Sequence, residues 1–122
     1  YEDISSSLLK TAKNNLSNYA IKIIKVPGVF EVPVTIAKNI KKYDAFIALG
    51  CVIKGETPHF DFLCTSVFNA LMDLSVKTKI PIGNGILTCN NKNQALRRAN
   101  PKKIDKGGAA ALALMSVLKS IS

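Results

Sequence analysis

Residues 45–61, AFIALGCVIKGETPHFD, form the stretch around which the rest of the chain is organised. The stretch starts with five apolar residues, 45–49, which leave no polar side chain for water, as is typical of a strand buried on both faces of a sheet. From Phe60 to Leu74, apolar residues recur three and four positions apart, which predicts a helix with one buried face. The stretch is therefore a strand-to-helix turn at the carboxyl end of a buried strand, where parallel α/β sheets bind their ligands.

The residues of this turn suit an anion and a proton-transfer group. Gly55 allows backbone conformations that other residues resist, while Thr57 and Pro58 favour the N-cap and the first position of a helix. The N–H groups behind such a cap favour phosphate. His59, the only histidine in the chain, can donate and accept protons near neutral pH. The alternative is an ordinary surface or core histidine.

The composition indicates one globular domain that occupies residues 1–122. The chain is 48% hydrophobic and 20% charged, and no run approaches the ~18 apolar residues of a membrane span. Its three cysteines, Cys51, Cys64 and Cys89, are too far apart to form a metal or redox motif. We therefore expect reduced thiols in a cytoplasmic protein.

The formal net charge of +9 has two explanations. The densest basic cluster consists of Arg97, Arg98, Lys102, Lys103 and Lys106, and such a cluster can bind nucleic acid. No aromatic residues lie between these cations, although a stacking platform for bases requires them. We therefore expect no nucleic-acid partner and attribute the charge to solubility and to an anionic small substrate.

Strands and helices alternate along the whole chain. The patterns predict helices at 4–18, 31–41, 58–78, 91–99 and 107–121, and strands at 20–26, 44–53 and 80–87. This alternation predicts a parallel sheet with helices on both faces, which is a three-layer α/β/α sandwich. Pro81, Gly83 and Gly85 interrupt the last strand, and residues 88–91 are expected to form a turn.

Three strand-to-helix turns should meet on one rim of this sheet: residues 27–31, the central turn, and residues 84–88. Phe30 can offer a flat apolar wall to a ring, and Glu31 can accept hydrogen bonds from hydroxyl or amine groups. The backbone at the end of the central strand, 51–53, can also face a ligand. Phe30 could instead belong to the core, and Glu31 could only offset the helix dipole. The convergence of the turns on one rim favours a ligand site.

Ordered motifs along nearly the whole chain resemble the 6,7-dimethyl-8-ribityllumazine synthase family. They occupy residues 26–33, 43–45, 49–60 and 85–88, and Gln94-Ala95, Arg98-Ala99 and Lys106-Gly107 continue the pattern. The resemblance implies a flavodoxin-like sheet of order 2-1-3-4 and the penultimate step of riboflavin biosynthesis. There, 5-amino-6-(D-ribitylamino)uracil condenses with 3,4-dihydroxy-2-butanone 4-phosphate, and phosphate and water are released. The resemblance also implies no metal, no cofactor, and a homopentamer or a higher assembly of pentamers.

The resemblance assigns a role to each residue that matches a family motif. His59 matches the proton donor. Glu56 and Thr57 would hold the phosphate, which Arg98 would reach from a neighbouring subunit, and Lys106 matches a basic position near the site. The pyrimidine and its ribityl chain would be bound by Val29, Phe30, Glu31, Cys51, Val52 and Ile53. Asn84 stands where many members carry an aromatic residue against the ring, which weakens stacking, and Lys54 stands where arginine is common.

The start of the sequence departs from a doubly wound pattern, because a helix comes before any strand. By resemblance, the family's first strand would precede Tyr1 and lie between the predicted strands at 20–26 and 44–53. Without it, both strands would carry unpaired backbone groups, which cost roughly 1–3 kcal/mol each if buried. We therefore expect about twenty further N-terminal residues in the full polypeptide, and no direct pairing between these two strands.

Two functions of other classes remain as alternatives. A non-catalytic flavodoxin-like module could bind a phosphorylated ligand, and an RNA-binding or shell-forming protein would also use the charge. The first would form no lumazine product, and the second would give a salt-dependent RNA gel shift.

Overall fold

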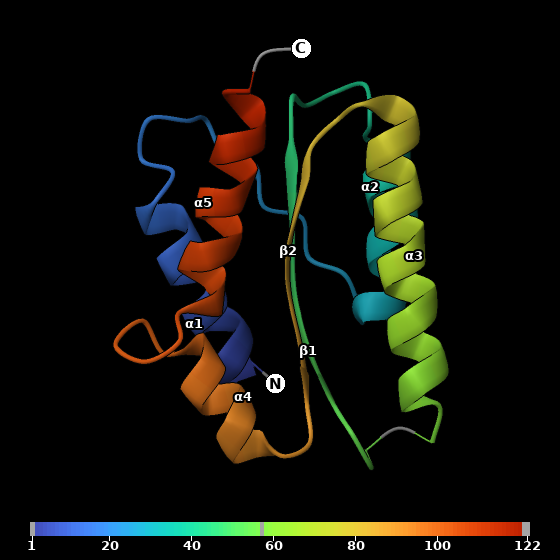
Figure 1. The fold of residues 1–122 in the computed structure, drawn as a ribbon, viewed down its shortest axis with the longest axis vertical. Coiled ribbons are helices and arrows are strands. Elements are labelled where there is room, and N and C mark those ends of the chain that lie inside the picture. Colours follow the sequence, from blue (N-terminus) through green and yellow to red (C-terminus); the bar gives the residue numbers. More distant parts are fainter. Residues whose placement is uncertain (1, 57, 121–122) are drawn as a thin grey trace.

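A two-stranded parallel sheet separates two helical layers in the computed structural model, which describes residues 2–56 and 58–120 (Figure 1). Strand β1 (Phe46–Ile53) pairs with β2 (Ile82–Cys89), from Phe46 opposite Ile82 to Ile53 opposite Cys89. The short 3-10 helix η1 (Val29–Glu31), α2 (Val32–Lys38) and α3 (Phe60–Thr78) cover one face. The other face carries α1 (Glu2–Asn14), α4 (Lys92–Ala99) and α5 (Lys106–Leu118). The predicted α/β/α sandwich with a parallel sheet is confirmed.

Successive side chains of β1 enter two separate cores, because side chains alternate along a strand. Ala48 and Val52 belong to the core under α2 and α3, which also contains Val32, Ile36, Val67, Leu71 and Ile86. Ile53 belongs to the core under α1 and α4, which also contains Ile4, Leu8, Leu87, Cys89, Ala95 and Ala99. This double burial explains why residues 45–49 carry no polar side chain.

Glycines let α5 approach the sheet and α1 closely. A methyl group on Gly107 would lie 2.4 Å from the carbonyl oxygen of Leu8, and one on Gly83 would lie 2.9 Å from the carbonyl oxygen of Ala110. Neither distance is possible without a shift of the backbone. The sequence indicated that Gly83 interrupts the strand, and this prediction is wrong. Gly83 lies within β2 and allows α5 to pack on it.

The strand predicted at 20–26 is wrong. These residues have no regular secondary structure and connect α1 to η1, and Ile21, Ile23 and Ile24 are 43–45% exposed. β-Branched residues favour a strand only where a neighbouring strand supplies hydrogen bonds and packing. Among the described residues, β1 and β2 alone make up the sheet, so 20–26 do not pair with β1. Direct pairing of residues 20–26 with β1 would have ruled out a further strand between them, and the described residues show no such pairing.

The other predicted elements are present with shifted ends. The first helix ends at Asn14 instead of residue 18, the predicted 31–41 helix is shortened to α2 and preceded by η1, and β2 runs to Cys89 instead of residue 87. Local caps fix the later helices: Asn91 accepts a hydrogen bond from the backbone N–H of Gln94 at 2.9 Å, and Asp105 accepts one from Gly108 at 3.2 Å. None of the helices in the described ranges is long and apolar enough to cross a membrane.

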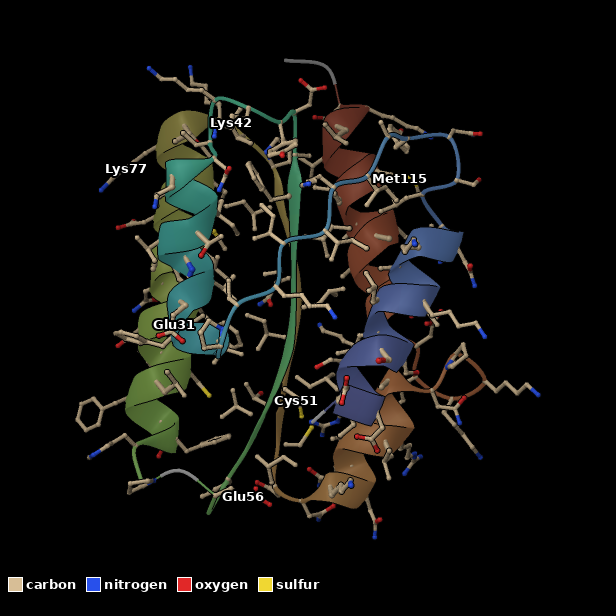
Figure 2. The ribbon with its side chains drawn as sticks, turned by 180° about the vertical axis from the view of Figure 1, so that it is seen from behind. Glu31, Lys42, Cys51, Glu56, Lys77 and Met115 are labelled. Carbon is tan, nitrogen blue, oxygen red and sulfur yellow. The ribbon has the colours of Figure 1, made fainter. Side chains whose placement is uncertain are left out.

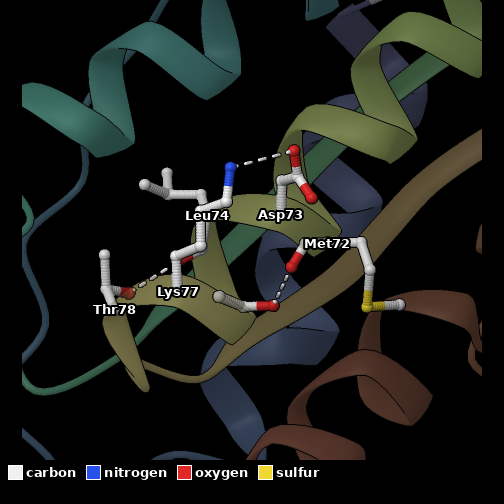
Figure 3. Close-up of polar contacts among 6 residues, drawn as sticks. Met72, Asp73, Leu74, Lys77 and Thr78 are labelled. Carbon is white, nitrogen blue, oxygen red and sulfur yellow. Dashed lines mark hydrogen bonds and ion pairs between the residues drawn. The ribbon is translucent and has the colours of Figure 1, made fainter.

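Helix α3 ends far from the turn that follows β1 (Figure 1). Figure 3 shows its last turns, where Lys77 lies 3.6 Å from Asp73 and the Thr78 hydroxyl donates to the Leu74 carbonyl at 2.6 Å. Lys79 then adopts a left-handed conformation with φ 61°, which stops the helix and turns the chain toward β2. The opposite end of α3, near His59, therefore faces the carboxyl edge of the sheet.

Candidate active site

The carboxyl ends of β1 and β2 lie at the same edge of the sheet because the strands are parallel. The backbone N–H of Lys54 donates to the Cys89 carbonyl at 2.7 Å, so the pairing continues one residue beyond β1. Gly55 then adopts φ 88°, a left-handed conformation that glycine reaches without steric cost. The Glu56 N–H donates to the Ile53 carbonyl at 3.3 Å and closes the turn. The predicted special conformation at Gly55 is confirmed.

His59 lies at the very start of α3, which begins two residues later than predicted. The predicted first helical position at Pro58 is therefore wrong. His59 itself is the N-cap residue, and its carbonyl accepts a hydrogen bond from the Leu63 N–H at 2.8 Å. Thr57 lies outside the described residues.

A hollow of about 420 Å³ opens beside this turn. His59 is exposed at its wall, together with a cation, Lys54, and a carboxylate, Asp61. The start of α3 adds the backbone N–H groups of its first turn, which favour an anion. The lining consists of Lys54, Gly55, Pro58, His59, Phe60, Asp61 and Phe62.

A second hollow of about 300 Å³ lies between η1, α2 and α3. Phe30 is 65% exposed at this hollow, so the interpretation of Phe30 as a core residue is wrong. Glu31 also lines it, and Gly28 leaves room for its carboxylate, since a methyl group on Gly28 would lie 3.3 Å from Glu31 Oε1. The lining consists of Phe30, Glu31, Pro33, Val34, Ser66, Val67 and Ala70.

Gly50 holds η1 against the sheet. A methyl group at this position would lie 2.7 Å from Cγ1 of Val29, so the absence of a side chain allows Val29 to pack directly on β1. Sequence reasoning missed this role, although a glycine inside a predicted buried strand often marks a close approach. Val29 is the residue before Phe30, so Gly50 indirectly sets where the exposed ring stands.

Val52 and Ile53 turn their side chains into the two cores, with 6% and 4% exposed. Only their backbone atoms can meet a ligand, as the sequence indicated. Cys51 is half-buried and packs against the core under α1 and α4, as Figure 2 shows. Burial and the neighbouring Cys89 thiol raise the pKa of Cys51 to about 11.

The raised pKa makes a prediction about Cys51 reactivity. With a pKa of about 11, roughly 1 thiol in 1,000 is ionised at pH 8, against about 1 in 4 for an ordinary cysteine. Iodoacetamide should therefore alkylate Cys51 of the folded chain at least ~100-fold more slowly than in the urea-unfolded chain. Its rate should rise about tenfold per pH unit up to pH 10. Peptide mapping by mass spectrometry measures it, and a plateau near pH 8.5 would contradict the assignment.

Arg98 is held at the end of β2. Its Nη1 donates to the Thr88 carbonyl at 3.0 Å and lies 3.6 Å from Sγ of Cys89. Arg98 is half-buried in the last turn of α4, and Lys106, also half-buried, begins α5 on the same face of the sheet. The contact with Cys89 is a second feature that sequence reasoning missed, because nine residues separate the two positions.

Asn84 is not in a turn, and the predicted strand-to-helix turn at 84–88 is wrong. Asn84 is exposed in the middle of β2, opposite Ala48, and its Oδ1 accepts a hydrogen bond from the Ile86 N–H at 3.0 Å. In the sequence, residues 83–85 resemble an interruption of the strand. In the structure they pair with residues 47–49 of β1. The turn after β2 begins only at Asn90.

The predicted site residues therefore fall into two groups on opposite faces of the sheet. Glu31 and His59 belong to the face covered by α2 and α3, and Arg98 and Lys106 belong to the face covered by α4 and α5 (Figure 1). Figure 2 shows Glu31 on the first side, Cys51 toward the second, and Glu56 beyond the end of β1. Within the described ranges, no group of three or more His, Cys, Asp or Glu side chains could hold a metal ion.

Together, the fold and these residues define a parallel α/β protein with a candidate ligand site at the carboxyl edge of its sheet, where an imidazole and several cations are available. The sequence model of 6,7-dimethyl-8-ribityllumazine synthase matches residues 1–122. The chain therefore belongs to this family of riboflavin-biosynthesis transferases, which condense 5-amino-6-(D-ribitylamino)uracil with 3,4-dihydroxy-2-butanone 4-phosphate.

Curated relatives agree with this assignment. The 6,7-dimethyl-8-ribityllumazine synthase of Rhodopseudomonas palustris (strain BisA53) is 43% identical over 98% of this chain and 78% of its own length. The protein of the same name from Bartonella tribocorum is 45% identical over 97% of this chain and 82% of its own length. The one from Agrobacterium fabrum is 42% identical over 98% of this chain and 86% of its own length.

Proposed function

We propose that the chain performs the condensation at the carboxyl edge of its sheet, with His59 as the proton donor. One observation carries this assignment: the exposed His59 stands at the start of α3 and shares a hollow with Lys54. The family's reaction needs an anion site and a proton-transfer group next to each other. The helix start supplies the first and the imidazole supplies the second.

Proton transfer enters several steps of this reaction. The amine of the pyrimidine adds to the ketone of the butanone, and the hydroxyl of the adduct leaves as water once it is protonated, which gives an imine. Phosphate then leaves, the ring closes, and a second water is lost. His59 would protonate the departing oxygen, a contribution of ~10²–10⁴-fold. Much of the remaining rate would come from holding the two substrates together.

The pyrimidine and its ribityl chain would occupy the hollow at η1. The exposed Phe30 offers its ring as one wall, and the Glu31 carboxylate can accept hydrogen bonds from hydroxyl or amine groups. Val29 would contribute through its backbone, as would Val52 and Ile53, whose side chains are buried. Asn84 cannot stack on the ring as an aromatic residue would, so we expect weaker binding of flavin-like products.

The phosphate would bind between the central turn and a second chain. Glu56 and Thr57 belong to the turn, and Arg98, with Lys106 nearby, would come from a neighbouring copy. This division is supported by the two faces of the sheet, since His59 and Arg98 lie in different layers of one chain. We therefore propose a homo-oligomer, a pentamer or an assembly of pentamers, in the cytoplasm, with no nucleic-acid partner.

The contact between Gly50 and Val29 gives a prediction about substrate choice. Gly50→Ala should push η1 away from the sheet, because the new methyl group would meet Val29 at 2.7 Å. We expect KM for the pyrimidine to rise roughly five- to twentyfold, with KM for the butanone phosphate nearly unchanged. Steady-state kinetics with each substrate varied in turn measures this. Val29→Ala in the same chain should restore the pyrimidine KM, and failure of that rescue would contradict the explanation.

A two-substrate assay tests the proposed function. Purified chain, pyrimidine and butanone phosphate should together yield lumazine absorbance and fluorescence, and one inorganic phosphate per lumazine. The flavodoxin-like alternative predicts binding of a phosphorylated ligand without product. Absence of product above the uncatalysed rate would overturn the proposal. An RNA gel shift at low salt would support the third alternative, and we expect none.

A further inference from the structure

Cys89 is the last residue of β2, and its side chain is almost completely buried, with 1% exposed. Its sulfur lies 3.6 Å from Nη1 of Arg98, which also donates to the Thr88 carbonyl at 3.0 Å. The carbonyl and the sulfur together form an acceptor pair at the end of the strand. The guanidinium is therefore fixed by two successive residues of β2 rather than left to move in solvent.

The N–H donors of Arg98 that β2 does not engage are suited to binding a phosphate. A guanidinium carries five N–H donors in a rigid plane, and a phosphate needs two of them along one edge. When Nη1 is held by β2, the orientation of the plane is set, and the donors on Nη2 and Nε keep a fixed direction. A side chain so fixed loses less conformational entropy when it binds phosphate.

The surroundings of Cys89 keep the sulfur in place. Cys89 packs in one core with Ala95 and Ala99 of α4, the helix that carries Arg98. On its other side it adjoins the thiol of Cys51, whose pKa it helps to raise. Both ends of the contact with Arg98 therefore belong to one rigid cluster.

We propose that Cys89 is a positioning residue for phosphate recognition, which acts by holding the guanidinium of Arg98. This inference rests on the proposed function, because it assumes that Arg98 binds the phosphate of the butanone substrate. Cys89 itself touches no substrate. Its loss should therefore weaken binding of the phosphorylated substrate and leave binding of the pyrimidine and the chemical step unchanged.

Kinetics of two substitutions test this role. Cys89→Ala removes the acceptor and should raise KM for the butanone phosphate roughly three- to tenfold, with kcat and the pyrimidine KM within about twofold of wild type. Cys89→Ser keeps an acceptor in a smaller side chain and should restore most of the affinity. Cys64→Ala, which shortens a cysteine of α3 on the other face, is the matched control and should change neither KM.

A double-mutant cycle separates positioning from packing. If Cys89 acts through Arg98, Cys89→Ala should add nothing to the butanone phosphate KM of Arg98→Ala. The inference would be overturned if the two substitutions raised the butanone phosphate KM independently, so that their factors multiply in the double variant. It would also be overturned if Cys89→Ala raised the KM of both substrates equally. Thermal melting of every variant shows whether it folds. Cys89→Val, which fills the space of the side chain but offers no acceptor, replaces Cys89→Ala if that variant does not fold, and the same roughly three- to tenfold rise in the butanone phosphate KM is expected.

Binding of inorganic phosphate, measured by calorimetry on the intact protein, keeps this inference distinct from the proposed function. The expected result is the same three- to tenfold loss for Cys89→Ala and recovery for Cys89→Ser. Active wild type with unchanged phosphate binding by Cys89→Ala would refute the role of Cys89 alone. Wild type that forms no lumazine would refute the proposed function, whatever Cys89 does to phosphate binding.

Discussion

Replacing His59 with alanine is expected to slow single-turnover lumazine formation by about one to three powers of ten, with both substrates still bound. The reason is that the substitution removes proton transfer but leaves the turn and the helix that position the substrates. His59 caps α3 through its backbone, and no side-chain cap hydrogen bond is present, so the helix start should survive the change. Rapid-mixing absorbance at saturating substrates measures the rate of the chemical step.

His59→Asn is the matched control for this prediction. Asparagine forms hydrogen bonds but cannot transfer a proton near neutral pH. It should be about as slow as alanine if proton transfer is what matters. A rate near wild type for His59→Ala would remove His59 from the mechanism, and rescue by asparagine would assign it a hydrogen-bonding role instead.

Replacing Arg98 with alanine is expected to raise KM for the butanone phosphate roughly 10- to 100-fold, because charge-assisted hydrogen bonds to phosphate are lost. KM for the pyrimidine should change little, since a guanidinium at this place would contact phosphate and little else. Steady-state kinetics with each substrate varied separately gives both values. Arg98→Lys should recover only part of the affinity, because lysine lacks the planar pair of donors.

The neighbouring Arg97 provides the control for charge alone. It lies in the same turn of α4 and is exposed, so Arg97→Ala removes the same charge from the protein. We expect it to leave both KM values within about twofold of wild type, because water and salt screen an exposed charge that makes no direct contact with the phosphate. Equal losses toward both substrates in Arg98→Ala would instead indicate a structural role for Arg98.

The sequence predicted the elements whose signals are local. The five apolar residues before Gly50 were enough to place a strand buried on both faces, because both of its faces meet helices. The helix predicted at 91–99 matches α4 to within one residue, and the Asn91 cap that begins it acts within one turn. The turn at Gly55 was predicted for the same reason, and His59 was expected in the first turn of the helix, although it is the N-cap residue.

Features that depend on distant neighbours were not predictable in the same way. Residues 20–26 have strand-forming side chains, but a strand also requires a partner, which the described sheet does not give them. Gly83 and Gly85 looked like breaks, yet both lie in β2, and a methyl group on Gly85 would lie 2.5 Å from Cδ2 of Leu49. Likewise, the contact of Arg98 with Cys89 depends on the direction in which α4 leaves the sheet.

The proposed site residues are divided between the two helical layers of the chain. His59 stands at the start of α3 on one face, and Arg98 is held at the end of β2 by α4 on the other. In the proposed site, His59 would come from one copy and Arg98 from the next copy around a ring. Heterologous contacts of this kind close into rings, in which every site is made in the same way.

Co-expression of two inactive variants tests this claim most directly. His59→Ala and Arg98→Ala chains carry different tags, and the mixed oligomer is purified through both and assayed at a butanone phosphate concentration well below the KM of Arg98→Ala. Random assembly of equal amounts places an intact His59 beside an intact Arg98 in about one site in four, so roughly a quarter of wild-type activity is predicted. Activity no higher than the average of the two separate variants would contradict a site shared between copies.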